Sequence, residues 1–497
     1  LALAAEAPGA VGVEGDAIHF VPPPGGPLVV TLTATLDEPP LTPIETTALL
    51  DSIPPGHERE LHALAFLSYR QKLLAGSWRF LTYFGRDTLL TVRLLMPHAR
   101  PELVEAGLGA VIDRLDPTGD VAHEEDIGDF AAWENHADGH VVDESPRFDY
   151  KMVDDDFLLA PVLAAYFESN GRDRAAAFLA RRTPRGVAYR DAIEENLHFV
   201  LRAARGYAAS PMADKLVHLH DRMPVGDWRD SNAGLADGRI PYDVNAALVP
   251  AALAAAAHLY HSRLFGADDQ RAAEAERLAA AWHVADRFRV EIPADEARTR
   301  VAAYANSIGV PAGDAVASID GPIVVRAISL DAEGRPIPVM NSDDGFVLLF
   351  GDPAPAFLDE AAGRLLRPFP AGLRTPIGIM VANPVFASEA VKHELTRADY
   401  HGTVVWSWQQ ALLAKGIDRQ LARTDLPAAT RTHLAAAQHA LWGAIRGAPE
   451  MVTSELWSWE VTDGHWRVVP FGQGAADADE SDAAQLWSTV YLAIPAP

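Results

Sequence analysis

The sequence predicts a mainly α fold in which pairs of antiparallel helices close into an (α/α)6 toroid. Apolar residues recur at helical spacing over most of the chain after residue 57, in about eleven or twelve segments. Long loops rich in polar and aromatic residues separate these segments. No sequence unit of about 20 to 50 residues repeats, which argues against a repeat solenoid. An open α-solenoid remains the rival architecture.

The elements are predicted in the following order. Residues 17–36 carry β-branched residues around a Pro/Gly turn, which indicates one or two strands. Helical segments follow, and strand candidates return at 321–350 before the pattern becomes helical again. The predicted helical segments include 57–76, 100–115, 154–171, 189–207, 243–266, 268–289, 387–400, 405–422, 427–447 and 482–494, and another begins at about Arg86.

This order predicts two parts of unequal size. Residues 1–50 form an N-terminal extension with short strands, and residues 51–497 form the toroid domain, with a β-rich insert at about 318–351. A chain of 497 residues with 49% hydrophobic content is long enough to bury a large core.

The composition excludes several classes of function. A net charge of -26 argues against nucleic acid as a partner, because binding to phosphates rests on Lys and Arg. No apolar run reaches the roughly 18 residues that a membrane span needs, so we expect no membrane segment. The absence of cysteine excludes disulfides, thiolate chemistry and Cys-ligated metals. The start "LALAAEAPGA" is consistent with a signal-peptide remnant, and thus with export, or with a disordered terminus of a cytoplasmic protein.

Four stretches between the predicted helices combine carboxylates with Trp, Tyr and His, and the first two lie before residue 160. Aromatic rings pack on the C–H faces of a sugar ring, and carboxylates bind its hydroxyls, so this mixture favours a carbohydrate ligand. "SWRFLTYFGRDTLL" places Arg86 and Asp87 at a helix start, where capping is the alternative role. The second stretch contains Trp133 in an acidic loop. The spacing of residues 154–156 does not match an EF-hand, so we predict neither a metal nor a cofactor.

The other two stretches carry the candidate catalytic carboxylates. "VGDWRDSNAG" holds Asp227 and Asp230 on either side of Trp228, and "IPYDVNAAL" follows it with Asn245. The fourth stretch runs from "DYHGTVVWSWQQALL" to "SELWSWEVTDGHWRVVPFG". Seven of the eleven tryptophans lie between residues 406 and 487, a density that predicts some of them in a cavity, although packing is the alternative for each one.

Glycoside hydrolysis needs two carboxyl groups, one protonated and one ionised. An adjacent aromatic ring excludes water and favours the protonated form, so Asp227 or Asp230 is suited to be the acid. Glu455 or Glu460 is the candidate second group. The chain lacks the G-x-S-x-G elbow of serine hydrolases and the H-E-x-x-H motif of zinc hydrolases, which argues against both classes.

Four motifs in order resemble those of the six-hairpin glycosidases, in particular the inverting α-glycosidases related to processing α-glucosidase I, mannosylglycerate hydrolase and the glucosidase part of glycogen debranching enzymes. They are "FGRDT" (84–88), "WRDS" (228–231) with "YDVNAAL", "YHGTVVWSWQQALLAKGI" (400–417), and "SELWSWEVTDG" with "QLWST". Ser407 and Gln410 stand where the family more often has Pro and Asn. No large β-sandwich precedes the toroid, unlike in many relatives, which favours a small glycoside over a polymer.

The resemblance implies roles for individual residues. Asp230 is the expected general acid and Glu455 the expected base, with Asp227 as a supporting residue and Glu460 as the rival base. In an inverting site the two carboxyls lie about 6.5 to 9.5 Å apart. The remaining expected substrate-binding residues are Arg86, Asp87, Trp133, Trp228, Asn245, His401, Trp406, Trp408 and Trp457.

The expected activity is therefore that of an exo-acting, inverting glycoside hydrolase, α-glucosidase-like, with a carbohydrate substrate. Two alternatives remain open: a polysaccharide lyase or sugar epimerase on the same toroid, and a sugar-binding protein without catalysis. The sequence leaves the sugar, the linkage and the oligomeric state open.

Overall fold

The computed structural model describes residues 2–6, 10–15, 17–26, 28–35, 40–77, 80–137, 139, 145–472 and 484–496. The chain divides into two compact units, Leu1–Thr42 and Pro43–Pro497. Part of the predicted acidic loop, at 138 and 140–144, and the first two residues of the predicted helix 482–494 lie outside the described residues.

The first unit consists of two antiparallel strand pairs. β1 (Ala2–Glu6) pairs with β4 (Thr31–Thr35), and β2 (Ala10–Glu14) pairs with β3 (Ala17–Val21). The sequence predicts one or two strands over residues 17–36, and β3 and β4 lie there.

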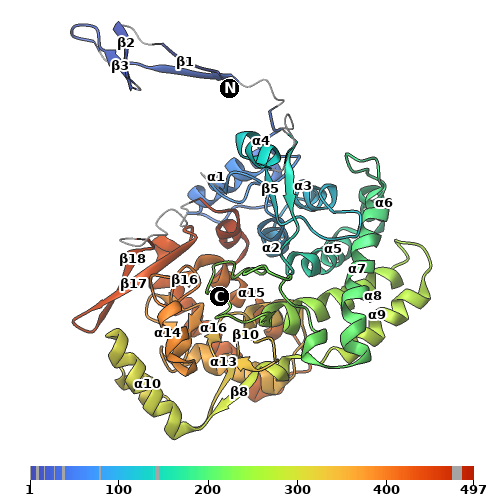
Figure 1. Cartoon of the computed structure of the whole chain (residues 1–497), viewed down its shortest axis with the longest axis vertical. Coiled ribbons are helices and arrows are strands. Elements are labelled where there is room, and N and C mark those ends of the chain that lie inside the picture. Colours follow the sequence, from blue (N-terminus) through green and yellow to red (C-terminus); the bar gives the residue numbers. More distant parts are fainter. Residues whose placement is uncertain are drawn as a thin grey trace. The chain divides into compact units, whose positions relative to one another are not determined.

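Six inner elements form a closed ring in the second unit (Figure 1). Each packs against the next, and the last packs against the first. In ring order they are α2 (Gly85–Leu95), α5 (Asp155–Asn170), η4 with α8 (Val244–Leu248 and Val249–His261), α12 (Asp344–Phe350), α15 (Ser407–Leu421) and η8 (Leu486–Ala493). This arrangement confirms the predicted mainly α toroid.

An outer helix accompanies each inner element. The outer helices are α3 (Pro101–Asp113), α7 (Tyr189–Ala209), α9 (Asp269–Ala281), α13 (Pro355–Leu366), α16 (Ala428–Arg446) and α1 (Glu58–Leu67). The inner helices are buried nearly all round: in α2 every residue except Arg93 is buried. The outer helices α7 and α9 bury one face, as their 3.6-residue apolar period predicts, whereas α3 is buried on all sides from Leu103 to Ile112.

Short strands and helices occupy the connections. The strand pairs that concern the site are β5 (Glu124–Asp126) with β6 (Arg147–Asp149), and β16 (Val405–Trp406) with β17 (Leu456–Thr462) and β18 (His465–Pro470). The other small strands are β7 (Ile240–Pro241), β8 (Arg289–Ile292), β9 (Ile323–Arg326), β10 (Ser329–Leu330), β11 (Pro336–Ile337), β12 (Met340–Asn341), β13 (Arg374–Thr375), β14 (Gly378–Ile379) and β15 (Ala382–Asn383). The remaining α-helices are α4 (Gly128–Ala137), α6 (Arg172–Leu179), α10 (Ala294–Ile308), α11 (Gly313–Ala317) and α14 (Glu389–Glu394).

Several segments differ from the elements that the sequence predicts. The predicted strand region 321–350 ends in the helix α12, because a short apolar run such as "GFVLLF" does not distinguish a buried strand from a buried helix. The predicted helix 268–289 ends at Ala281. The predicted helix 57–76 ends at Leu67, because the chain turns back there and the Leu74 N–H donates to the Leu67 carbonyl at 2.9 Å. The predicted helix 387–400 is helical only over Glu389–Glu394. The late Trp-rich stretch is the β17–β18 hairpin, in keeping with its alternating apolar residues. None of the described helices is long and apolar enough to cross a membrane.

Candidate active site

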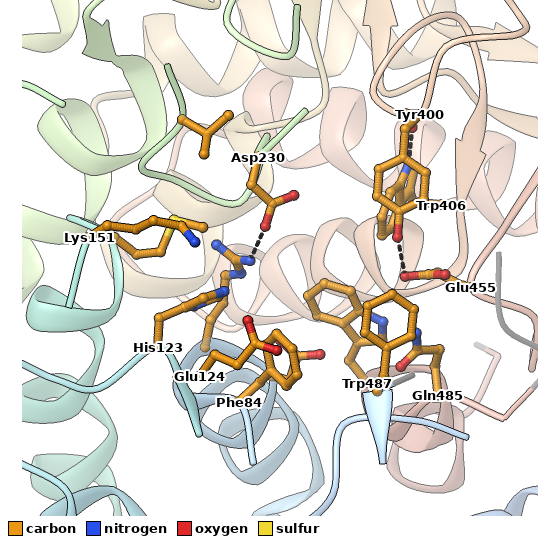
Figure 2. Close-up of a pocket in the computed structure, with 15 residues that line it drawn as sticks. Phe84, His123, Glu124, Lys151, Asp230, Tyr400, Trp406, Glu455, Gln485 and Trp487 are labelled. Carbon is orange, nitrogen blue, oxygen red and sulfur yellow. Dashed lines mark hydrogen bonds and ion pairs between the residues drawn. The ribbon is translucent and has the colours of Figure 1, made fainter. Parts of the chain in front are cut away.

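The candidate site is a cavity of about 300 Å³ in the second unit, lined by side chains from widely separated parts of the chain (Figure 2). Its lining residues are Phe80, Phe84, Arg86, Asp87, His123, Glu124, Lys151, Met152, Val225, Asp230, Tyr400, Trp406, Glu455, Gln485 and Trp487. Four carboxyl groups, two cations and five aromatic rings of Phe, Tyr and Trp therefore surround one space.

Arg86, in the first turn of α2, joins two of the carboxylates near the cavity. Its Nη2 donates to Asp230 Oδ2 at 2.7 Å, and its Nη1 donates to Asp154 Oδ2 at 3.1 Å. The start of α2 packs closely against the segment at Ala122, which is possible because residue 85 is glycine. A Cβ at residue 85 would lie 2.5 Å from the carbonyl oxygen of Ala122. The glycine thus sets the depth at which Arg86 enters the site.

Asp230 lies on a loop that its buried neighbours hold in place. Trp228 is fully buried, and the Arg229 guanidinium packs 4.2 Å from the centre of its ring. Arg229 also donates to both oxygens of Asp343, at 2.8 and 2.9 Å, and to the Val381 carbonyl at 2.8 Å. The Asp230 side chain keeps 27% of its surface exposed, so the loop presents this carboxyl to the cavity while its neighbours are anchored in the core.

Two consecutive residues, Tyr400 and His401, connect the Asp230 loop to Glu455. The Ser231 N–H donates to His401 Nδ1 at 3.3 Å, and the Ser231 hydroxyl lies 2.9 Å from the same nitrogen. His401 Nε2 lies 3.8 Å from Asp230 Oδ1. Burial lowers the pKa of His401 well below its usual value, aided by the charges of nearby arginines, so the ring is neutral. On the other side, the Tyr400 hydroxyl donates to Glu455 Oε1 at 2.6 Å.

Strand pairing positions Glu455, which directly precedes β17. The Ser407 N–H donates to the Glu455 carbonyl at 3.0 Å, and β16 pairs with β17 through Trp406 and Leu456. The Trp406 ring lines the cavity, and its Nε1 donates to the Tyr400 carbonyl at 3.0 Å. Glu455 is 1% exposed, so its carboxylate is reached only from the cavity.

Two further carboxyl groups in the wall are protonated more readily than usual. Burial raises the pKa of Asp87 to about 8, although the adjacent Arg86 cation opposes this. Burial, followed by repulsion from Asp126, raises the pKa of Glu124 to about 7. Near neutral pH both groups are therefore able to donate as well as accept hydrogen bonds, which suits the binding of sugar hydroxyls.

The structure brings five of the predicted site residues into the cavity wall: Arg86, Asp87, Asp230, Trp406 and Glu455. Three others pack behind the wall in one aromatic cluster, in which Trp228 meets His401 and Trp408 edge to face. Trp457 is buried on β17, where it pairs with Val405 of β16. Asp227 is also buried and accepts from the Arg229 N–H at 3.2 Å.

Three predicted residues lie away from the cavity wall. Asn245 is buried and bonds the backbone of Val217 in both directions at 2.9 Å, which ties the chain before the Asp230 loop to η4. Trp133 lies on α4 with 64% of its surface exposed. Glu460 lies on β17, where it pairs across the hairpin with Arg467 and is partly exposed.

The sequence analysis does not single out ten of the lining residues. Tyr400, Gln485 and Trp487 stand inside the motifs "YHGTVVWSWQQ" and "QLWST", so their position beside the matched residues is a signal that could have identified them. Phe84 directly precedes "GRDT" in the same way. No local signal distinguishes the others, which are Phe80, His123, Glu124, Lys151, Met152 and Val225, because only the tertiary fold brings their segments to the cavity.

Comparison with known proteins identifies the fold. No family model and no curated protein matches the chain. GH63 mannosylglycerate hydrolase from Thermus thermophilus in complex with glucose is similar in structure, with a TM-score of 0.51 and 14% identity over 88% of this chain and 99% of that one. The same protein in complex with Tris and D-glycerate gives a TM-score of 0.52 and 12% identity over the same shares. The chain thus has a six-hairpin glycosidase-like fold.

Proposed function

We propose that the protein is an exo-acting, inverting glycoside hydrolase in which Asp230 is the general acid and Glu455 the general base. The observation that carries this proposal is that the two carboxyl groups line one cavity from distant parts of the toroid sequence, each with its own partners. In Figure 2 the two carboxyl groups enter the cavity from different sides.

The proposed reaction gives different roles to the two carboxyl groups, which enter the cavity from different sides. Asp230 gives its proton to the glycosidic oxygen as the bond to the anomeric carbon breaks, and the leaving group departs as an alcohol. Glu455 takes a proton from the water molecule that attacks the opposite face of the same carbon. The Tyr400 hydroxyl, hydrogen-bonded to Glu455 Oε1, orients the base.

The lining of the cavity supports a carbohydrate substrate. Phe84, Trp406 and Trp487 offer rings to the C–H faces of a sugar, while Asp87 and Gln485 offer polar groups to its hydroxyls. The cavity lies at the lower end of the range for ligand sites, about 300 to 1,000 Å³, which favours one terminal sugar residue over the middle of a polymer. The bound glucose of the structural neighbour points to the same class, and the resemblance of the four sequence motifs to α-glycosidases favours an α-glycoside.

A screen against aryl and natural α- and β-glycosides tests the proposal, with NMR to identify the anomer released first. Hydrolysis of an α-glycoside with release of the β-anomer is the expected result. Release of the α-anomer would refute inversion. An unsaturated product would instead support a lyase, an epimerised sugar would support an epimerase, and tight binding without turnover would support a sugar-binding protein.

A further inference from the structure

A groove of about 400 Å³ lies next to the cavity and shares Glu124 with it. The same two segments border both spaces. Residues 80–84 supply Phe80 and Phe84 to the cavity, and residues 123–127 continue from the cavity wall into the groove. The groove is lined by Leu81, Thr82, Glu124, Glu125, Asp126, Ile127 and Phe130. The cavity and the groove therefore meet at Glu124.

Large apolar side chains gather at this groove with their surfaces open to solvent. Leu81 and Ile127 are each about two-fifths exposed, and Phe130 is 54% exposed. Trp133, one turn further along α4, is 64% exposed, and its ring centre lies 6.0 Å from that of Phe130 at an angle of 33°. Exposed apolar side chains that occur singly need no explanation, but a contiguous group beside a cavity marks a binding surface.

Carboxyl groups stand beside these rings. Burial, followed by repulsion from neighbouring carboxylates, raises the pKa of Asp126, and Glu124 stands at the junction of cavity and groove. These groups repel an anionic ligand and accept hydrogen bonds from hydroxyls. Aromatic faces with adjacent carboxyl groups match a neutral sugar ring, which has an apolar face and a rim of hydroxyls.

The groove lies on the side of the cavity from which the leaving group must depart. Figure 2 shows Glu124, His123 and Lys151 on the Asp230 side, with Tyr400 and Glu455 on the other. A general acid must reach the oxygen that links the cleaved sugar to its leaving group. The leaving group therefore projects toward the Asp230 side, where Glu124 leads into the groove.

We propose that this groove binds the leaving group of the substrate and that the leaving group is a second, neutral sugar ring stacked on Phe130 and Trp133. This inference rests on the proposed glycosidase activity and adds that the substrate is at least a disaccharide. Glu124 sits between the two rings and bonds hydroxyls of both.

The test compares two classes of substrate on the full chain. α-Glucosyl and α-mannosyl fluoride carry a leaving group too small to reach the groove, whereas α-linked disaccharides of the same sugar fill it. Phe130→Ala and Trp133→Ala should each lower the ratio of kcat/KM for the disaccharide to kcat/KM for the fluoride, by about tenfold when combined. Phe130→Trp keeps an aromatic face, so this variant should retain most of the parent protein's ratio.

The matched control is Phe66→Ala, because Phe66 on α1 is 51% exposed and lines neither the cavity nor the groove. This variant should leave the ratio unchanged. If the parent hydrolyses the fluorides but no disaccharide, or if the Phe130 and Trp133 variants leave the ratio unchanged, the leaving-group assignment is wrong and the glycosidase proposal stands. If the parent hydrolyses neither class, both proposals are refuted.

Discussion

The two sides of the cavity hold their carboxyl groups in different ways. The Asp230 side depends on charged contacts, since Arg86 bonds the carboxylate directly and the buried Arg229–Asp343 pair anchors the loop. The Glu455 side depends on backbone pairing at the start of β17 and on a neutral donor, the Tyr400 hydroxyl. Asp230 is partly exposed and Glu455 is almost fully buried. The site thus combines a loop that ion pairs hold in place with the start of a strand that backbone pairing holds in place.

The largest effect should come from removing either carboxyl group. Glu455→Gln should lower kcat by about 10²- to 10⁴-fold on every substrate, because no other group replaces the base. Asp230→Asn should cause a similar loss on disaccharides and a much smaller loss on glycosyl fluorides, whose leaving group needs no proton. Steady-state kinetics on both classes measures the difference. Equal losses for Asp230→Asn on both would contradict its role as the acid.

A large loss of stability should follow when the buried charge pair behind Asp230 is broken. Asp343→Asn leaves the Arg229 guanidinium without its ionised partner in the core, which should cost about 3 to 5 kcal/mol of unfolding free energy. Chemical denaturation measures this value. The matched surface pair is Arg335 with Asp331, and Asp331→Asn should cost less than about 1 kcal/mol. Equal costs for the two variants would show that the loop is not anchored through Arg229.

A smaller effect should come from Tyr400→Phe, which removes one hydrogen bond to Glu455 and keeps the ring. A hydrogen bond to a charged group contributes about 1.5 to 3 kcal/mol, so kcat should fall by about 10- to 100-fold. The fall should be the same on disaccharides and fluorides, because the base acts on both. A loss confined to disaccharides would place Tyr400 on the leaving-group side instead.

The last prediction concerns the pH dependence of stability. Burial raises the pKa of Asp87 from 3.8 to about 8, so the folded state binds this proton more tightly than the unfolded state. The stabilisation is fully present below about pH 4 and is lost as pH rises to about 8, at about 1.4 kcal/mol per pH unit. Asp87→Asn should remove this contribution and flatten the curve of unfolding free energy against pH. An unchanged slope between about pH 4 and 8 would contradict the raised pKa.

Local patterns predict the helices well and the late hairpin poorly. The apolar period of 3.6 residues identifies α7 and α16, since these outer helices bury one face. The segment that forms β17 and β18 is instead interpreted from the sequence as a loop, because its tryptophans suggest a ligand-binding surface. Three of the late tryptophans pack in the core instead: Trp457 and Trp459 on β17, and Trp408 behind the wall.

The candidate site is predictable only where a motif carries the residue. Arg86, Asp230 and Glu455 stand in recognisable motifs, and all three line one cavity. Glu124 and Lys151 carry no such signal, because β5 and the chain after β6 reach the cavity only through tertiary packing. Trp133 is expected in the cavity wall because of the composition of its segment, yet on α4 its side chain is exposed to solvent beside Phe130.

Because η8 closes the helix ring, it determines when the parts of the cavity come together during folding. α1 and η8 pack together although they come from opposite ends of the second unit, and η8 carries Trp487 at the cavity wall. During synthesis, Asp230 emerges long before Glu455, and both precede Trp487. A nascent chain thus holds an incomplete, open ring until η8 leaves the ribosome. Contacts of such long sequence separation form slowly, so we expect the cavity to be complete only after η8 has packed against α1 and α2.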